Sequence, residues 1–503
     1  MMKLVTPVLC LLVCLTTNLT QAVDQPNIVV FLVDDMGLMD TSVPFITSAE
    51  GKAERHPLND FYRTPSMKRL ADQGIRLSHF YAMSVCSPTR ASILSGQTSA
   101  RHYTTQFISP EKKNTGGFGP PAWKWKGFTK DDNTFPKLLQ KAGYRTIHAG
   151  KAHFGPNNSL ASDPTNLGFD INIAGCAYGQ PGSYYGKDHF GHAKKGREKR
   201  AVPGLEKYHG KDIYLTEALT LEMNAAITES VKAKKPFFAY MSHYAVHAPF
   251  QADPRFIKNY TETKGNLASF ASMIEGMDKS LGDMLDHLEK LGVAENTIVF
   301  FLGDNGTDAP AGSTHKIACS APLRGKKGTH YEGGMRVPFI AAWAKPNAAH
   351  PAQKQTPIAQ GVIINNMGAV YDLYPTVLAL AGVKSSAKNI DGINLLPILS
   401  GKIALAERDF LMHFPHGHRS SYFTSYRKGD WKVIYHYQPG SKEKIGKYEL
   451  FNLKTDRSES NNLAESNPKE LKAMMTALAE KLTETKAQYP HDKEGIELKP
   501  IIP

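Results

Sequence analysis

Two uninterrupted apolar segments, each followed at once by acidic or amide residues, constrain the fold of this chain most strongly. The segments cover residues 27–33 and 297–302, and each is apolar after its first residue, Asn27 or Thr297. The polar residues that follow are Asp34 and Asp35 after the first segment and Asp304 and Asn305 after the second. Apolar runs of this length, rich in β-branched and aromatic residues, are typical of strands buried on both faces of a parallel sheet. The sequence therefore predicts an α/β fold.

The rest of the chain separates into a large unit and a smaller one. Residues 23–385 alternate apolar strands with helical stretches, for example at 66–74 and 133–143, which is typical of a mainly parallel sheet flanked by helices. Residues 386–503 differ. Short apolar runs at 421–427, 431–435 and 448–453, followed by a helical segment at about 468–488, predict a small C-terminal α+β subdomain with an antiparallel sheet.

The N-terminus has the composition of a secretory signal. Lys3 precedes an apolar core at residues 8–15, and small residues at 20–22 suit cleavage before Val23. We therefore predict a signal peptide over residues 1–22 and a periplasmic or secreted protein. The apolar core is too short to span a bilayer, and no later segment is long and apolar enough, so we expect no membrane span. Export would allow Cys176 and Cys319 to pair, but their spacing does not decide it.

The polar residues after the two strands suggest a metal site. In open α/β sheets, ligands bind at the carboxyl ends of the strands, so these three carboxylates and one amide oxygen would meet there. They would repel one another without a cation, and hard oxygen ligands suit Ca²⁺, or Mg²⁺ with more water ligands. Either pair alone is explained as well by ordinary turn chemistry. Two such pairs on two buried strands favour the metal site.

A second motif, Cys86-Ser87-Pro88-Thr89-Arg90, suggests an anion site. Pro88 fits the first position of a helix, which would run to about Leu94 with Cys86 or Ser87 as its N-cap. Free N–H groups and the positive end of the helix dipole would then favour a sulfate or phosphate beside Cys86. The plainer alternative is a capped helix with a small buried cysteine.

The same motif resembles the signature of type I, formylglycine-dependent sulfatases, and the chain resembles arylsulfatases and bacterial polysaccharide sulfatases along most of its length. Three further segments match that family in order, at residues 142–153, 236–249 and 323–334. The resemblance implies an alkaline-phosphatase-like fold and a catalytic set of Cys86, Arg90, Lys151, His153, His247 and Lys327. It also implies one Ca²⁺ ion held by Asp34, Asp35, Asp304, Asn305 and the modified Cys86.

The resemblance also implies a reaction. A formylglycine-generating enzyme would convert Cys86 into formylglycine, whose hydrate attacks a sulfate ester and forms a covalent sulfate intermediate stabilised by Ca²⁺. His247 with Lys327 would protonate the leaving alcohol, and His153 would accept the proton that drives release of sulfate; the two histidines could exchange these roles. One departure from many relatives is Ala152, where tryptophan is common, and it concerns packing.

The substrate is expected to be a sulfated carbohydrate. The net charge of +13 favours anionic partners, and no motif with interleaved aromatics suggests nucleic-acid binding. Aromatic and basic residues outside the catalytic set suit sugar contacts, namely Trp123, His416, His418 and Arg419; similarity suggests a sulfated galactose or N-acetylgalactosamine unit. The alternatives are a phosphodiesterase or phosphonate hydrolase of the same superfamily and a non-catalytic binder of sulfated glycans.

Overall fold

A computed structural model describes most of the chain. The described residues are 25–111, 113–114, 117–192, 195–196, 198–310, 319–402, 407–437 and 446–503. The predicted signal peptide lies outside them. Within these ranges, no helix combines the length and the apolar character needed to cross a membrane. Cys86, Cys176 and Cys319 are all free thiols.

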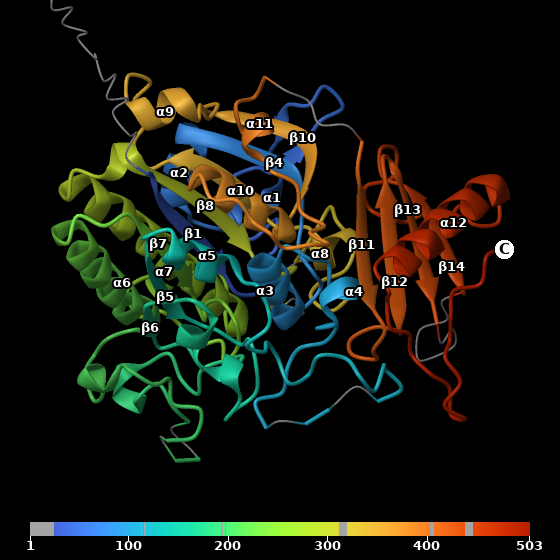
Figure 1. Cartoon of the computed structure of the whole chain (residues 1–503), viewed down its shortest axis with the longest axis horizontal. Coiled ribbons are helices and arrows are strands. Elements are labelled where there is room, and N and C mark those ends of the chain that lie inside the picture. The colour runs from blue at the N-terminus through green and yellow to red at the C-terminus, as the bar shows by residue number, and fades with distance from the viewer. Residues whose placement is uncertain are drawn as a thin grey trace, which may run out of the picture.

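A large mixed sheet forms the centre of the molecule (Figure 1). Its strand order is β10-β4-β9-β8-β1-β7-β5-β6, and all neighbouring strands are parallel except at β9, which runs antiparallel to both its neighbours. These strands are β1 (Asn27–Val33), β4 (Gly74–Tyr81), β5 (Arg145–Gly150), β6 (Ile171–Ile173), β7 (Phe237–Ser242), β8 (Thr297–Gly303), β9 (Phe339–Trp343) and β10 (Val362–Ala369). A small hairpin pairs β2 (Ile46–Thr47) with β3 (Ala53–Glu54).

The predicted mainly parallel sheet is confirmed, and strand β1 shows why its sequence is continuously apolar. Every residue from Asn27 to Val33 is buried. Ile28, Val30 and Leu32 pack into one hydrophobic core, whereas Val29 and Phe31 pack into a second core on the opposite face. Because successive side chains point to opposite faces of a sheet, burial on both faces favours an apolar residue at every position. The exception is Asn27 at the start of the strand, whose amide bonds to Thr297 Oγ1 and to the Phe237 N–H.

Helices cover both faces of this sheet. Helices α2, α6 and α7 contribute to the core that contains Val29, and α3, α5 and α10 contribute to the core that contains Ile28. The helices are α1 (Pro57–Phe61), α2 (Pro65–Gln73), α3 (Cys86–Ser95), α4 (Ser99–His102), α5 (Phe135–Lys141), α6 (Leu215–Lys232), α7 (Asn266–Lys290), α8 (Glu332–Met335), α9 (Pro351–Gln355), α10 (Leu373–Leu380), α11 (Leu396–Leu399) and α12 (Pro468–Glu484).

A four-stranded antiparallel sheet follows near the C-terminus and lies at one end of the molecule, in orange to red in Figure 1. Its strands, in spatial order, are β11 (Asp409–Phe414), β12 (Phe423–Lys428), β13 (Trp431–His436) and β14 (Tyr448–Asn452). Phe410 and Phe423 pack against the large unit, and Leu411 and Tyr426 pack with helix α12. Three of the strands and the helix were predicted from the sequence, although α12 ends earlier than expected; β11 was not predicted.

Candidate functional site

The polar residues that follow β1 and β8 lie together because these two strands are neighbours. Strand β1 pairs with β8 in parallel register, with Val33 opposite Gly303. The four residues after this pair are completely buried, and they are Asp34, Asp35, Asp304 and Asn305. Carboxylate oxygens of the three aspartates approach within 4.8 Å of one another. The structure thus brings together the four predicted metal ligands.

Their hydrogen bonds leave oxygen atoms for a cation. Asn305 donates through Nδ2 to Asp35 Oδ1 at 2.9 Å. Among the described residues, neither Asn305 Oδ1 nor Asp34 Oδ1 has a hydrogen-bond partner. Burial and the nearby carboxylate of Asp304 raise the pKa of Asp34 well above its ordinary value. Buried oxygens without donors, grouped with carboxylates that repel one another, fit a Ca²⁺ ion.

Arg90 fixes the cluster from helix α3. It is fully buried, and it donates to Asp304 Oδ2 through Nη2 at 2.8 Å and through Nε at 3.0 Å. Its Nη1 donates to the Lys151 carbonyl at 2.8 Å and to Ser242 Oγ at 2.6 Å. Asp34 lies 3.6 Å from Nη2. Although burial opposes it, the attraction of Asp304 and Asp34 raises the pKa of Arg90, so this arginine remains a buried cation.

The start of helix α3 differs from the sequence prediction. The helix begins at Cys86, with Val85 as its N-cap, and ends at Ser95 before Gly96 in the left-handed conformation. Pro88 is therefore the third helical residue, where its missing N–H still costs no intrahelical hydrogen bond. Cys86 and Ser87 lie inside the first turn, which places their side chains beside the free N–H groups of the helix.

Two buried lysines each pair with one carboxylate of the cluster. Lys151, just after β5, donates to Asp34 Oδ2 at 2.7 Å. Lys327 donates to Asp35 Oδ2 at 2.7 Å and also lies 2.6 Å from Oδ1. Burial alone would raise the pKa of Asp35, but the charge of Lys327 outweighs it and holds this pKa below the ordinary value. The same ion pair raises the pKa of Lys327.

His153 faces Cys86 and is held in a defined tautomer. Its Nε2 lies 2.7 Å from the carbonyl oxygen of Ile108, so Nε2 carries the proton and donates it. Its Nδ1 is then an acceptor, 3.4 Å from Cys86 Sγ and 3.3 Å from Ser87 Oγ. Burial and the neighbouring Lys151 hold the pKa of His153 well below its ordinary value, which keeps the ring neutral.

His247 approaches the cluster from the segment after β7. Its Nε2 lies 3.7 Å from Asp35 Oδ2, and its Nδ1 donates to the Ala248 carbonyl at 2.9 Å. Burial and the charge of Lys327 lower the pKa of His247 to about 3. All six side chains of the predicted catalytic set therefore lie around the strand-end cluster.

Sequence reasoning missed three residues that shape this site. Ser242 ends β7 and accepts a hydrogen bond from Arg90. Ile108 fixes the His153 ring through its carbonyl oxygen, a backbone role that leaves no signal in the sequence. Asp308, four residues after Asp304, pairs with Arg419. Of these, only Asp308 had a sequence signal, because it belongs to the same polar stretch as Asp304.

The four predicted substrate contacts divide into two pairs. Trp123 and His416 are buried, at 2% and 0% exposure, and their rings pack edge to face with centroids 5.3 Å apart. Their substrate contact stays a prediction, and this burial means that a sugar would reach them only if neighbouring residues moved. His418 and Arg419 are exposed. Both side chains lie against the backbone of Gly328, next to Lys327, and Arg419 Nη2 donates to Asp308 Oδ2 at 2.9 Å.

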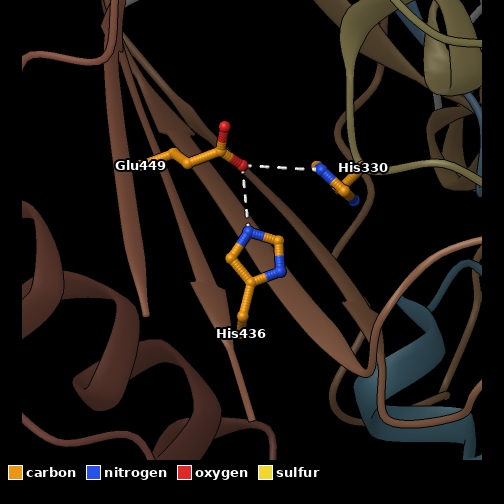
Figure 2. Close-up of side chains that lie close together, drawn as sticks. All are labelled: His330, His436 and Glu449. Carbon is orange, nitrogen blue, oxygen red and sulfur yellow. Dashed lines mark hydrogen bonds and ion pairs between the residues drawn. The ribbon is translucent and has the colours of Figure 1, made fainter. Parts of the chain in front are cut away.

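A second buried cluster consists of His330, three residues after Lys327 in the same loop, with His436 and Glu449 of the C-terminal sheet (Figure 2). The carboxylate of Glu449, on β14, accepts from His436 Nε2 at 2.9 Å, and His330 Nε2 lies 3.5 Å away from the same oxygen. Its composition would suit a metal ion. Burial and the neighbouring His436, followed by the positive charges of Lys432 and Arg324, lower the pKa of His330, and these two positive charges oppose a bound cation. The cluster is therefore better explained as a link between the loop and the C-terminal sheet.

We expect Glu449→Gln to weaken this link. The substitution removes the charged acceptor shared by His436 and Tyr331, whose hydroxyl donates to Glu449 Oε1 at 3.0 Å. Loss of hydrogen bonds to a charged group costs about 2 kcal/mol, and the loosened loop should lower kcat through Lys327. Thermal unfolding and steady-state kinetics measure both effects. Glu465→Gln, at an exposed position, is the matched control; equal behaviour of the two variants would contradict the supporting role.

Two family models match the chain. The first, described as sulfatase, matches residues 26–383. The second, described as N-sulphoglucosamine sulphohydrolase, C-terminal, matches residues 326–488. The second match spans the Lys327 loop and the C-terminal sheet, so the two matches together include all the residues of the site described above.

Curated sulfatases and solved structures are also similar to this chain. The chain is 30% identical to N-acetylgalactosamine-6-sulfatase of Mus musculus over 75% of this chain and 67% of that protein. It is 28% identical to a sulfatase of Formosa agariphila over 88% and 85%. Among solved structures, Ps i-CgsB has a TM-score of 0.71 at 24% identity and covers 93% of this chain and 96% of its own. This structural likeness concerns the fold, which is that of the sulfatases.

Proposed function

Because the chain belongs to the sulfatase family of sulfuric ester hydrolases, we propose that it hydrolyses sulfate esters of a sulfated carbohydrate. The observation that carries this proposal is that Cys86 and the five other side chains of the predicted catalytic set lie around one cluster of buried carboxylates. The names of similar proteins support the substrate class. One relative is an N-acetylgalactosamine-6-sulfatase, and Ps i-CgsB has been solved in complex with k-i-k-neocarrahexaose.

The proposed enzyme needs two groups at this site, a formylglycine derived from Cys86 and one Ca²⁺ ion. Asp34, Asp35, Asp304 and Asn305 would hold the ion, since they supply grouped buried oxygens, two of which, Asp34 Oδ1 and Asn305 Oδ1, have no donor among the described residues. When both groups are bound, the hydrated formylglycine would supply a nucleophilic oxygen whose pKa the cation lowers.

The side chains around position 86 would bind the sulfate group and move protons. Lys151 and Lys327 are buried cations, so they can stabilise negative charge that grows on the sulfate oxygens. His153 Nδ1 is an acceptor directed at position 86, and it can take a proton from a hydroxyl group there. On the Asp35 side of the cluster, Lys327 is the protonated group that can donate to the leaving alcohol, and His247, whose Nδ1 proton is held by the Ala248 carbonyl, would relay that proton through Nε2.

Maturation and export belong to the same proposal. The predicted signal peptide would direct the protein to the periplasm or outside the cell, and a formylglycine-generating enzyme would modify Cys86 during maturation. The domain boundary near residue 385 also stays a prediction. The match of a separate C-terminal family model to residues 326–488 supports two units. This match begins before the first one ends at residue 383, so the two matches overlap ahead of the predicted boundary.

The test of this function is a comparison of reactions. We expect kcat/KM for an aryl sulfate to exceed that for the matching phosphate diester. The reverse ratio would favour the phosphodiesterase alternative. Binding of a sulfated glycan without turnover of either ester would favour the non-catalytic binder.

Arg419 is the residue that we expect to contact the carbohydrate and to contribute to substrate specificity. It is exposed beside Gly328 and oriented by Asp308, so it can donate to a sugar hydroxyl or a second sulfate. Arg419→Ala should lower kcat/KM on a sulfated oligosaccharide about tenfold or more, because hydrogen bonds to charged groups contribute about 1.5–3 kcal/mol. A small aryl sulfate carries no sugar hydroxyl or second sulfate for Arg419 to bind, so the variant should cleave it nearly as well as the unmodified enzyme does.

The matched control for this prediction is Arg69→Ala. Arg69 is also paired with carboxylates, those of Asp286 and Glu289, but it lies on helix α2 in the layer that covers the sheet. Its substitution should change neither substrate's kcat/KM. Equal losses on both substrates in Arg419→Ala would instead place Arg419 in the catalytic or structural machinery.

A further inference from the structure

A second polar pocket lies between the large sheet and the C-terminal sheet. Its volume is about 320 Å³. Its walls come from the β2 segment, from β4, β10 and α8, and from the ends of β12 and β14. Its basic side chains are Arg336, Arg427, Lys454 and Arg457, and its acidic ones are Glu332 and Asp430. None of the residues around Cys86 lines this pocket.

Arg336 is a buried cation with an incomplete set of acceptors. Its side chain is 6% exposed, and Nε donates to the Ser78 carbonyl at 2.6 Å. Among the described residues, the carboxylate paired with its Nη1 is that of Glu332, at 3.9 Å, which is too long for a hydrogen bond. Burial and repulsion by Arg427 and Arg457 lower the pKa of Arg336.

Glu332 alone cannot neutralise these arginines, because its carboxylate already accepts hydrogen bonds from two other side chains. Tyr81 donates to its Oε2 at 2.7 Å, and Lys432 donates to its Oε1 at 3.1 Å. Arg427 reaches only to 4.0 Å from Oε2. Lys432 has a second carboxylate in Glu459, but burial raises the pKa of Glu459 to about 7. Asp430 also attracts Arg427, but Glu332 lies 3.9 and 4.0 Å from Arg336 and Arg427, beyond hydrogen-bond distance of both guanidinium groups. A buried charge with so distant a partner is costly.

We propose that this pocket binds an oxyanion of the sulfate type, held by Arg336, Arg427 and Arg457. Guanidinium groups bind such anions through paired hydrogen bonds. Asn365 adds a neutral donor, because its amide oxygen already accepts from Thr47 and Ser78 at 2.9 and 2.6 Å and leaves its NH₂ group for a ligand. The charge argument requires only an oxyanion; the choice of sulfate rests on the proposed function.

Two sources can supply this group, and the pocket chemistry is the same for both. One is a sulfate ester elsewhere on the carbohydrate, which would anchor the substrate. The other is the free sulfate ion that hydrolysis releases. A pocket of about 320 Å³ has room for either the ion or a sulfated sugar unit.

Titration of inorganic sulfate into the full-length enzyme tests the proposal. We expect two binding events, one at the strand-end site and one in this pocket. Arg457→Ala, whose side chain is 39% exposed and pairs with Glu54 on the surface, should fold and should weaken the second event about tenfold or more. Arg336→Met should abolish it. Both variants should keep the kcat of the unmodified enzyme on a small aryl sulfate, and Arg69→Ala should keep both binding events.

Two further measurements give the location of the second binding event and the source of its oxyanion. A selenate-soaked crystal should show anomalous scattering beside Arg336 and Arg427. A sulfated oligosaccharide that displaces sulfate from the second event, when its desulfated form does not, identifies the ester; failure to displace it identifies the free ion.

The proposal is overturned if the enzyme shows one binding event that Lys327→Ala removes, or if both events persist unchanged in Arg457→Ala and Arg336→Met. If Arg336→Met does not fold, Arg457→Ala and the selenate position decide. A failure of the proposed function would look different, because two sulfate-binding events would persist in an enzyme that hydrolyses no sulfate ester.

Discussion

Cys86→Ala is expected to abolish sulfate ester hydrolysis while the protein stays folded. The side chain at position 86 lies in the first turn of α3, 3.4 Å from the acceptor nitrogen of His153. Every step of the proposed reaction uses the group made from this cysteine, so kcat should fall on the order of 10⁵-fold or more. Removing one buried sulfur atom leaves only a small cavity, so the free energy of unfolding should change by about 1 kcal/mol.

Two further variants sharpen this result. Cys86→Ser should release at most one equivalent of alcohol and then stop, because a serine sulfate has no second hydroxyl to expel sulfate. Cys319→Ala, at another free and half-buried cysteine, should keep the activity. Full activity in Cys86→Ala would remove position 86 from the mechanism.

Asp304→Ala should produce the second large effect, on both stability and activity. Asp304 is completely buried and accepts two hydrogen bonds from Arg90 at 2.8 and 3.0 Å. Its removal leaves Arg90 with Asp34 at 3.6 Å as its remaining carboxylate, so the free energy of unfolding should fall by about 3–5 kcal/mol. Denaturant unfolding measures this loss. Activity should fall to background, because a ligand of the proposed Ca²⁺ is gone.

The control for Asp304 is Asp286→Ala. Asp286 also pairs with an arginine, Arg69, but its side chain is 70% exposed, so its loss should cost less than about 1 kcal/mol.

Exhaustive chelation of metal ions is a second test of the proposed Ca²⁺ site. It should abolish the activity of the unmodified enzyme, and added Ca²⁺ should restore it. Unchanged activity after chelation would contradict the metal site.

The part of the site that depends on strand ends could be predicted from the sequence. Burial on both faces makes strands β1 and β8 apolar after their first residues, Asn27 and Thr297, and an apolar run that stops at a carboxylate marks the strand end. The adjacency of β1 and β8 then brings Asp34 and Asp304 together. The resemblance to sulfatases supplied the rest of the predicted set, because single lysines and histidines carry little signal of their own.

Contacts between distant segments could not be predicted in this way. The acceptors of Arg90, and the burial of Trp123 against His416, depend on how loops far apart in the chain pack together. The start of α3 was misplaced because proline is accepted throughout the first turn, so Pro88 marks that turn without fixing its first residue. Strand β11 was missed because Asp409–Phe414 shows no clear turn signal before it; its pairing with β12 defines it.

The measurement that tests the central claim most directly is the mass of the peptide that contains residue 86 in active enzyme. Conversion of Cys86 to formylglycine should make this peptide about 18 Da lighter than its cysteine form, and the converted fraction should rise in proportion to kcat across preparations made with different amounts of formylglycine-generating enzyme. An enzyme that is fully active with an unmodified thiol at position 86 would contradict the mechanism.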